Sequence, residues 1–100
     1  MAHGPEKKVK DKIAKTLKEL NAWFFMPPAN GYGRAGIPDF IGIISGHPIA
    51  IEAKAGKNQP TALQLREIER IRTAGGTALI VNEENVEDLK AILEEKMNKG

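Results

Sequence analysis

Helical periodicity of apolar positions appears three times along the chain. From Glu6 to about Leu20 the spacing predicts an amphipathic helix, whose inward positions are Val9, Ile13, Leu17 and Leu20. A second helix is predicted from Thr61 to about Ala74, and Gly75-Gly76 ends it. A third helix follows Asn85 as its N-cap, and its apolar positions are Val86, Leu89, Ile92, Leu93 and Met97.

Strand-length apolar segments lie between these helices. Ala22–Met26 is rich in aromatic residues and ends at Pro27-Pro28, which predicts a strand. We expect both of its faces, Trp23 with Phe25 and Phe24 with Met26, to be core. Thr77–Val81 is continuously apolar, which predicts a central strand joined to the preceding strand by a parallel, right-handed crossover.

The middle of the chain predicts a β-hairpin. The apolar runs Gly36–Ile44 and His47–Lys54 are separated by Ser45-Gly46. A two-residue loop that contains glycine suits the primed turns of hairpins. Both faces of this hairpin are apolar, so we expect both to be covered.

The register of the hairpin decides where its few charges lie. If Ile44 pairs with His47, Asp39 lies opposite Glu52, and Lys54 shares their face of the sheet. A register shifted by one residue would send Asp39 to the opposite face from the other two charges. The expected register therefore gathers two acids and one amine at the open end of the hairpin.

The predicted order is α-β-β-β-α-β-α, an α/β domain with a mixed sheet flanked by helices. A chain of 100 residues forms one domain with one modest core. We expect residues 1–5 to be a flexible N-terminus, residues 6–97 to be the folded domain, and residues 98–100 to be a frayed C-terminus.

Composition narrows the classes of function. Cysteine is absent, which excludes disulfides and thiolate metal sites. No apolar run approaches the roughly 20 residues that span a bilayer, so we expect a cytoplasmic protein without a membrane partner. The formal net charge of +2 is too small to establish a nucleic-acid partner.

Two carboxylates held together on neighbouring strands call for a compensating charge. They repel each other, and poor solvation of either one is costly unless a cation or a proton is nearby. A divalent ion such as Mg²⁺ is commonly held by one or two carboxylates and water. The alternative is a structural ion pair, in which Lys54 alone neutralises the acids.

These residues resemble a known nuclease signature. Pro38-Asp39, followed after a hairpin by Glu52-Ala53-Lys54, looks like the PD-(D/E)XK motif. The chain also resembles the virus-type replication-repair nuclease branch of that superfamily, the VRR-NUC domain, over nearly all of residues 6–93. The further segments that carry this resemblance are Gly31–Asp39, Thr61-Ala62-Leu63-Gln64 and Ala74-Gly75-Gly76. The predicted order of elements is that of the PD-(D/E)XK, restriction-endonuclease-like core.

The resemblance implies a metal-dependent DNA endonuclease of the stand-alone phage and bacterial type. It implies that Asp39, Glu52 and the backbone carbonyl of Ala53 hold Mg²⁺ or Mn²⁺, and that Lys54 orients or helps to deprotonate the attacking water. Similar stand-alone members look like homodimers that act on branched DNA, including four-way (Holliday) junctions. We therefore expect a homodimer that acts in DNA repair in a bacterial or phage-infected cell.

Two further residues have both a structural and a catalytic interpretation. Projected at about 100° per residue, Glu6 falls inside the apolar stripe of its helix. It either complements the helix dipole or, as the resemblance implies, is an auxiliary acid near the metal site. Gln64 lies three residues after the N-cap Thr61, in the capping-box position, and its family counterpart lies beside the catalytic lysine. The two roles of Gln64 are compatible.

The loops on either side of this site supply candidates for DNA contacts. Arg34 offers a bidentate phosphate contact, the glycines around it let the backbone approach a phosphate, and Tyr32 is able to stack on a base. Loop packing is the alternative for Tyr32. The candidate DNA-binding residues are Tyr32, Gly33, Arg34 and, in the basic loop after the hairpin, Lys57.

Other classes of function are less consistent with the sequence. Gly31, Gly33 and Gly36 formally match the dinucleotide fingerprint G-x-G-x-x-G. The third glycine of that fingerprint opens a helix, whereas Ile37-Pro38 leads into a strand, so we expect no nucleotide cofactor. A non-catalytic DNA-binding module and a nuclease of the same fold acting on flaps or other structures are the alternatives. The intact acidic set argues against the first of them.

Overall fold

The computed structural model describes residues 4–28 and 35–98, and in these residues the elements follow one another in the predicted order. A short 3-10 helix, η1, is added before the last helix. The fold of the α/β domain is therefore confirmed. The elements are α1 (Pro5–Glu19), β1 (Trp23–Phe25), β2 (Phe40–Ile44), β3 (His47–Ala53), α2 (Ala62–Thr73), β4 (Thr77–Val81), η1 (Val86–Asp88) and α3 (Leu89–Asn98).

The described strands form one mixed sheet in the order β1-β2-β3-β4. β1, β2 and β3 pair in antiparallel fashion, and β4 runs parallel to β3 after the α2 crossover, as expected. The prediction that Thr77–Val81 is a central strand is wrong, because β4 lies at an edge of this sheet. Its apolar character has another cause, since α2 packs on one face of β4 while Val81 contributes to the core on the other face.

The β2–β3 hairpin has the predicted register. Ile44 pairs with His47 across the turn, and the pairing continues to Phe40 and Ile51. Both turn residues, Ser45 and Gly46, have positive φ angles, of 48° and 83°. Positive φ at both central positions is the requirement of a type I′ turn, whose twist matches that of the strands.

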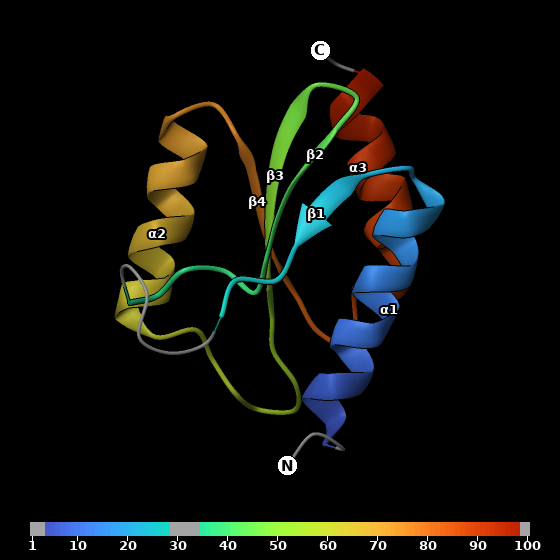
Figure 1. The fold of residues 1–100 in the computed structure, drawn as a ribbon. Helices are drawn as coiled ribbons and strands as arrows, with labels where there is room; N and C mark the ends of the chain where they lie inside the picture. The colour runs from blue at the N-terminus through green and yellow to red at the C-terminus, as the bar shows by residue number, and fades with distance from the viewer. Residues whose placement is uncertain (1–3, 29–34, 99–100) are drawn as a thin grey trace.

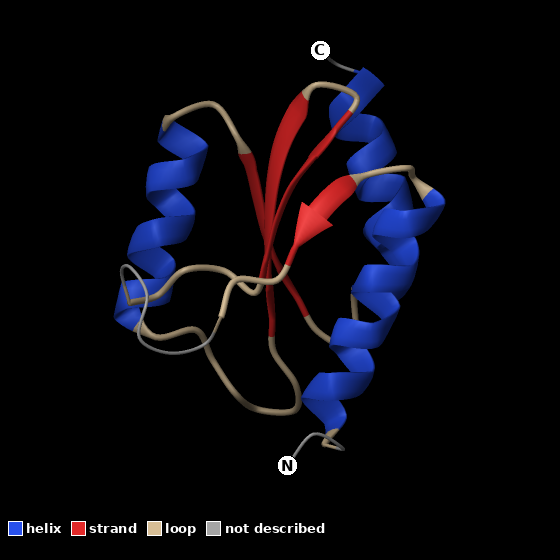
Figure 2. Cartoon of the chain, in the orientation of Figure 1, coloured by secondary structure: helices blue, strands red, loops and turns tan. Residues whose placement is uncertain are grey.

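Helices cover the two faces of the sheet unequally. Figures 1 and 2 show α1 and α3 together on one side of the sheet and α2 alone on the other. The larger core cluster lies on the α1–α3 side and includes Phe40, Ile44 and Ile51 from the hairpin. The smaller cluster lies under α2, where Ile68 packs with Ala50. The two faces of the hairpin therefore pack into different clusters.

The prediction that β1 is core on both faces is wrong. Only Phe24 packs against the main core, whereas Trp23 and Phe25 are 64% and 46% exposed and Met26 is also exposed. Trp23 pairs with Ile43, which is exposed as well, so that full cover of the hairpin is not observed either. The cause is the strand order. α2 packs on β4, at the opposite edge of the sheet, so the part of the same sheet face that β1 forms is left uncovered.

The ends of the helices differ from expectation in detail. α1 begins at Pro5, one residue before the expected start, since proline suits the first helical position. α3 includes Asn98, which we expected to be frayed. Asn85 precedes η1, but its side chain does not cap a helix; it accepts from the Asn82 N–H and donates to the Ile80 carbonyl. Among the described helices, none combines the length and the apolar character that a membrane crossing requires.

We predict that Gly42→Ala destabilises the sheet. A Cβ atom at Gly42 would lie 2.3 Å from the Trp23 carbonyl oxygen and 2.7 Å from the Phe24 Cβ, so β1 and β2 would have to separate. Overpacking of this kind costs about 1–3 kcal/mol in the free energy of unfolding, which urea denaturation measures. Gly4→Ala is the matched control, because a Cβ at Gly4 meets nothing within 4 Å. Equal stability of the two variants would contradict this prediction.

Candidate active site

The end of β3 and the start of β2 bring the two predicted acids together. The Phe40–Ile51 pair places Asp39, the residue before β2, next to Glu52 across the ladder. The Ala53 N–H donates a hydrogen bond of 2.8 Å to Asp39 Oδ2, which holds this carboxylate against the end of β3. The hairpin register thus produces the convergence that the sequence predicts.

Glu52 is a buried acid with incomplete compensation. Only 3% of its surface is exposed. Its Oε2 atom lies 3.5 Å from Lys54 Nζ, and its Oε1 atom is buried without a hydrogen-bond partner among the described residues. Burial, followed by the charge of Asp39, raises the pKa of the Glu52 carboxyl from 4.5 to about 7, while Lys54 opposes the rise. The site therefore favours either a proton or another positive charge at Glu52.

Gln64 belongs to the capping box of α2 and also contacts one of the two acids. The side-chain oxygen of Gln64 accepts a hydrogen bond from the Thr61 backbone N–H at 2.9 Å, and the backbone N–H of Gln64 donates to Thr61 Oγ1. The two bonds complete a capping box at the start of α2. Its Nε2 atom also donates to Glu52 Oε2 at 3.1 Å. The cap fixes the first turn of α2, and the fixed side chain in turn orients the carboxylate of Glu52.

Glu6 is connected to the site through Lys10, a residue that no sequence motif marks. Glu6 Oε2 lies 3.4 Å from Lys10 Nζ, and the same ammonium lies 3.7 Å from Asp39 Oδ1. The charge of Glu6 also contributes, as the last of several causes, to the raised pKa of Glu52. The signal for Lys10 was its position four residues after Glu6, which places both side chains on the same side of a helix.

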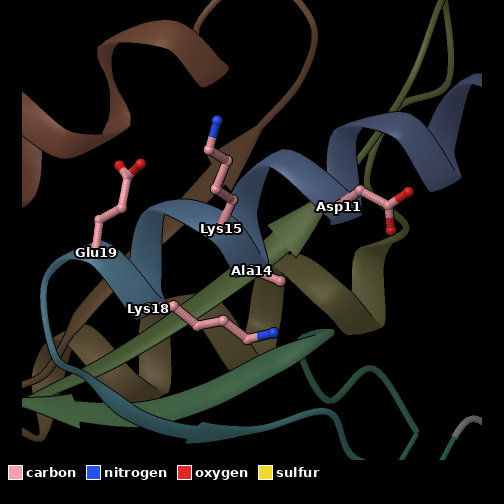
Figure 3. Close-up of a pocket in the computed structure, with 5 residues that line it drawn as sticks. All are labelled: Asp11, Ala14, Lys15, Lys18 and Glu19. Carbon is pink, nitrogen blue, oxygen red and sulfur yellow. The ribbon is translucent and has the colours of Figure 1, made fainter.

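An open cleft adjoins Asp39. Its volume is about 430 Å³, and the polar residues on its wall are Lys10, Asp39 and Gln64. The rest of the wall comes from Met26–Pro28, at the end of β1, and from Ala35–Pro38, before β2. A larger depression of about 540 Å³ lies along the C-terminal half of α1 (Figure 3). Its side chains point away from the helix in different directions, and they do not include the acids of the site.

The acids suit a divalent cation, although the described residues contain no cluster of three His, Cys, Asp or Glu side chains. Mg²⁺ and Mn²⁺ prefer oxygen ligands, and Mg²⁺ often binds only one or two carboxylates and keeps several waters. The adjacent Asp39 and the buried, unpartnered Oε1 of Glu52 supply such oxygens. The donor set thus fits a hard divalent ion.

The candidate DNA contacts are only partly described. Lys57 is exposed in the loop between β3 and α2. Glu83 accepts hydrogen bonds from the Gly56 N–H and so ties this loop to the segment after β4. Tyr32, Gly33 and Arg34 lie outside the described residues.

The raised pKa of Glu52 predicts a pH dependence of stability in metal-free buffer. The folded state holds the Glu52 proton more tightly than the unfolded state, so the free energy of unfolding falls as pH rises from 4.5 to about 7. This interval corresponds to a loss of up to about 3 kcal/mol. Urea denaturation at several pH values should show that Glu52→Gln removes this fall, whereas Glu84→Gln, at an exposed position, keeps the wild-type profile. A fall of equal size in wild type and Glu52→Gln would contradict this assignment.

Comparison with known proteins agrees with the geometry. No family model matches the sequence, and no curated protein matches it. Several solved structures match, among them two that each have a match probability of 1.00. One, titled "VRR_NUC domain", is 26% identical, with a TM-score of 0.68 and coverage of 85% of this chain and 92% of its own. The other, titled "VRR_NUC domain protein", is 19% identical, with a TM-score of 0.69 and coverage of 97% and 91%, and it supports the fold alone. These matches support a VRR-NUC domain, and the chain has the α/β fold of that nuclease domain.

Proposed function

We propose that this chain is a metal-dependent DNA endonuclease that hydrolyses phosphodiester bonds, with branched DNA such as four-way junctions as its preferred substrate. The observation that carries the proposal is the pairing of Asp39 with a buried Glu52 that has one unpartnered oxygen. The ammonium of Lys54 lies beside this pair. The VRR-NUC fold supports the nuclease class.

The residues of the site have distinct roles in this proposal. Asp39, Glu52 and the backbone carbonyl of Ala53 would hold Mg²⁺ or Mn²⁺, which when bound supplies polarisation of the phosphate and lowers the pKa of bound water. Lys54 orients or helps to deprotonate the attacking water and stabilises the charge that develops on the phosphoryl group. Lys54 is well placed for this because it is held at 3.5 Å from Glu52.

Gln64 and Glu6 support the acids rather than replace them. The hydrogen bond from Gln64 to Glu52 Oε2 leaves the other carboxylate oxygen for a ligand. Glu6 adds negative charge on the α1 side of the site and is the auxiliary acid. The exposed Lys57, together with Tyr32, Gly33 and Arg34, is assigned to DNA contacts outside the reacting centre.

The dinucleotide-binding alternative is not supported. Gly36, which would be the third glycine of its fingerprint, leads into β2 and not into a helix. Gly36 has a φ of +85°, and a Cβ there would lie 2.5 Å from the Leu63 carbonyl oxygen. This glycine therefore has a structural reason of its own, the close approach of the loop to the start of α2.

Cleavage assays on linear, flapped and four-way DNA test the proposal, each with Mg²⁺, Mn²⁺ or EDTA. We expect cleavage with either metal, none with EDTA, and the fastest cleavage on four-way DNA. Asp39→Ala and Glu52→Ala should each lower the rate by about 100-fold or more, because the metal ligands are lost. Lys54→Ala should lose turnover to a similar extent but still bind Mn²⁺ in calorimetric titrations.

Glu84→Ala is the control for loss of an exposed acid, and it should cleave at the wild-type rate. Normal cleavage by Glu52→Ala would refute the proposed site. Faster cleavage of flaps than of four-way DNA would contradict the proposed preference for four-way junctions. Binding without cleavage would indicate a non-catalytic DNA-binding module.

We also propose that two copies of the chain form a homodimer through the outer face of β1. Trp23, Phe25 and Ile43 expose large apolar side chains side by side, 64%, 46% and 49% of their surfaces respectively. Clustered exposed apolar side chains of this size are typical of interaction sites. β1 is an edge strand of the described sheet and can pair with its own symmetry copy. Two copies would present two active sites to the two strands of a junction in the cytoplasm of a bacterial or phage-infected cell.

The emission of Trp23, the single tryptophan, reports on this interface. With rising protein concentration we expect the emission to shift to shorter wavelength while light scattering shows a doubling of mass, because Trp23 becomes buried. Phe25→Lys should prevent both changes. Leu65→Lys is the matched control, because Leu65 is 45% exposed on α2, and it should behave as wild type. A monomer at all concentrations would refute the dimer.

A further inference from the structure

Lys10 occupies a special position among the lysines of α1. It lines the cleft beside Asp39, together with Gln64 of α2. Lys12, by contrast, points to the other side of the helix and makes an ion pair of 2.8 Å with Glu87. Lys10 is thus a cation of α1 that faces the reacting end of the sheet.

The contacts of Lys10 are loose. Its ammonium lies 3.4 Å from Glu6 and 3.7 Å from Asp39, whereas Lys7 and Lys12 approach their partners at 2.9 Å and 2.8 Å. The Lys10 side chain is 30% exposed. An ion pair of this length and exposure contributes little to stability, about 0–1 kcal/mol. Its position in the cleft therefore needs another explanation.

The balance of charge in the site explains why a lysine at position 10 would be useful. Three carboxylates, those of Glu6, Asp39 and Glu52, face two ammonium groups, those of Lys10 and Lys54. With every group ionised the set carries one net negative charge, which would repel a phosphodiester. With a divalent cation added the net charge becomes positive by one, which matches the single negative charge of a phosphodiester. Without Lys10 the loaded site would be neutral.

The two lysines are also separated in space. Lys54 lies against Glu52, which is buried, whereas Lys10 lies against Asp39 at the wall of the open cleft. A DNA strand that enters the cleft would meet Lys10 at its margin, while Lys54 stays at the reacting centre. Lysine is well suited to this task, because its flexible ammonium binds phosphate as a point charge.

We propose that Lys10 binds a backbone phosphate of the DNA strand that occupies the cleft and so positions the scissile bond against Asp39 and Glu52. This assignment rests on the proposed nuclease function and adds to it a residue for substrate positioning. It makes Lys10 a contributor to DNA affinity rather than to the chemical step. Loss of Lys10 should therefore raise KM more than it lowers kcat.

The test measures binding of a fluorescent four-way DNA junction by anisotropy over a range of salt concentrations, with Ca²⁺ as the probe metal. Loss of one phosphate contact lowers the salt slope of the binding constant by about one. We expect Lys10→Gln to show this change with an affinity weaker by roughly ten-fold or more, the loss typical of one charge-assisted contact. Lys10→Arg should keep most of the wild-type salt slope and most of the wild-type affinity, because it keeps the positive charge. Lys12→Gln removes the same charge from the far side of α1 and should leave the slope unchanged.

Cleavage with Mg²⁺ by the same variants separates this inference from the function on which it rests. If wild type cleaves DNA and Lys10→Gln has an unchanged salt slope, the nuclease proposal stands and the role of Lys10 is overturned. An equal change of slope in Lys12→Gln would also overturn it, because the effect would then be one of net charge. If wild type neither binds nor cleaves DNA, both proposals fail. Thermal unfolding of each variant shows whether a lower affinity reflects a loss of folded protein.

Discussion

The antiparallel register of β2 and β3 is the constraint on which the site depends. It places Asp39 beside Glu52 at one end of the sheet, where the pKa of the buried Glu52 rises to about 7. Gln64 and Lys54 each offset part of this unfavourable charge through Glu52 Oε2. The Oε1 atom is left without a partner among the described residues. Local conflict of this kind, tolerated within a well-packed domain, is typical of functional sites.

The surrounding layers bring further groups to the same end of the sheet. The first turns of α1 and α2 and the C-terminal end of β3 lie toward the same end of the sheet (Figure 1). α1 contributes Glu6 and Lys10, while the capping box of α2 contributes Gln64. The N-terminus of a helix also carries partial positive charge, which favours nearby anions. Gly36 allows the loop before β2 to pack directly on the start of α2, and both segments line the cleft beside Asp39.

Local chemistry allowed much of this structure to be predicted. The boundaries of α1 and α2 followed from apolar periodicity and from the Thr61–Gln64 capping box, within a residue or two. The start of α3 did not, because the 3-10 helix η1 precedes it. The hairpin register followed from the two-residue turn at Ser45-Gly46, because such a turn favours direct pairing of the two residues that flank it. With the register known, the convergence of the acids was a matter of counting along two strands. The capping position of Gln64 followed from its spacing to Thr61, whereas its approach to the acids was what the family resemblance implied.

The sequence by itself thus determined the elements, their order, the hairpin register and the acid pair, because these depend on contacts between residues near in the chain or joined by one tight turn. Only the tertiary structure decided that Trp23 is exposed and that β4 lies at an edge of the described sheet. Both outcomes depend on which strands a helix covers, and apolar composition is the same for a covered and an uncovered strand. The approach of Lys10 to Asp39 was likewise decided by the packing of α1 on the sheet, since a lysine within a lysine-rich helix carries no local sign of the partner that it meets.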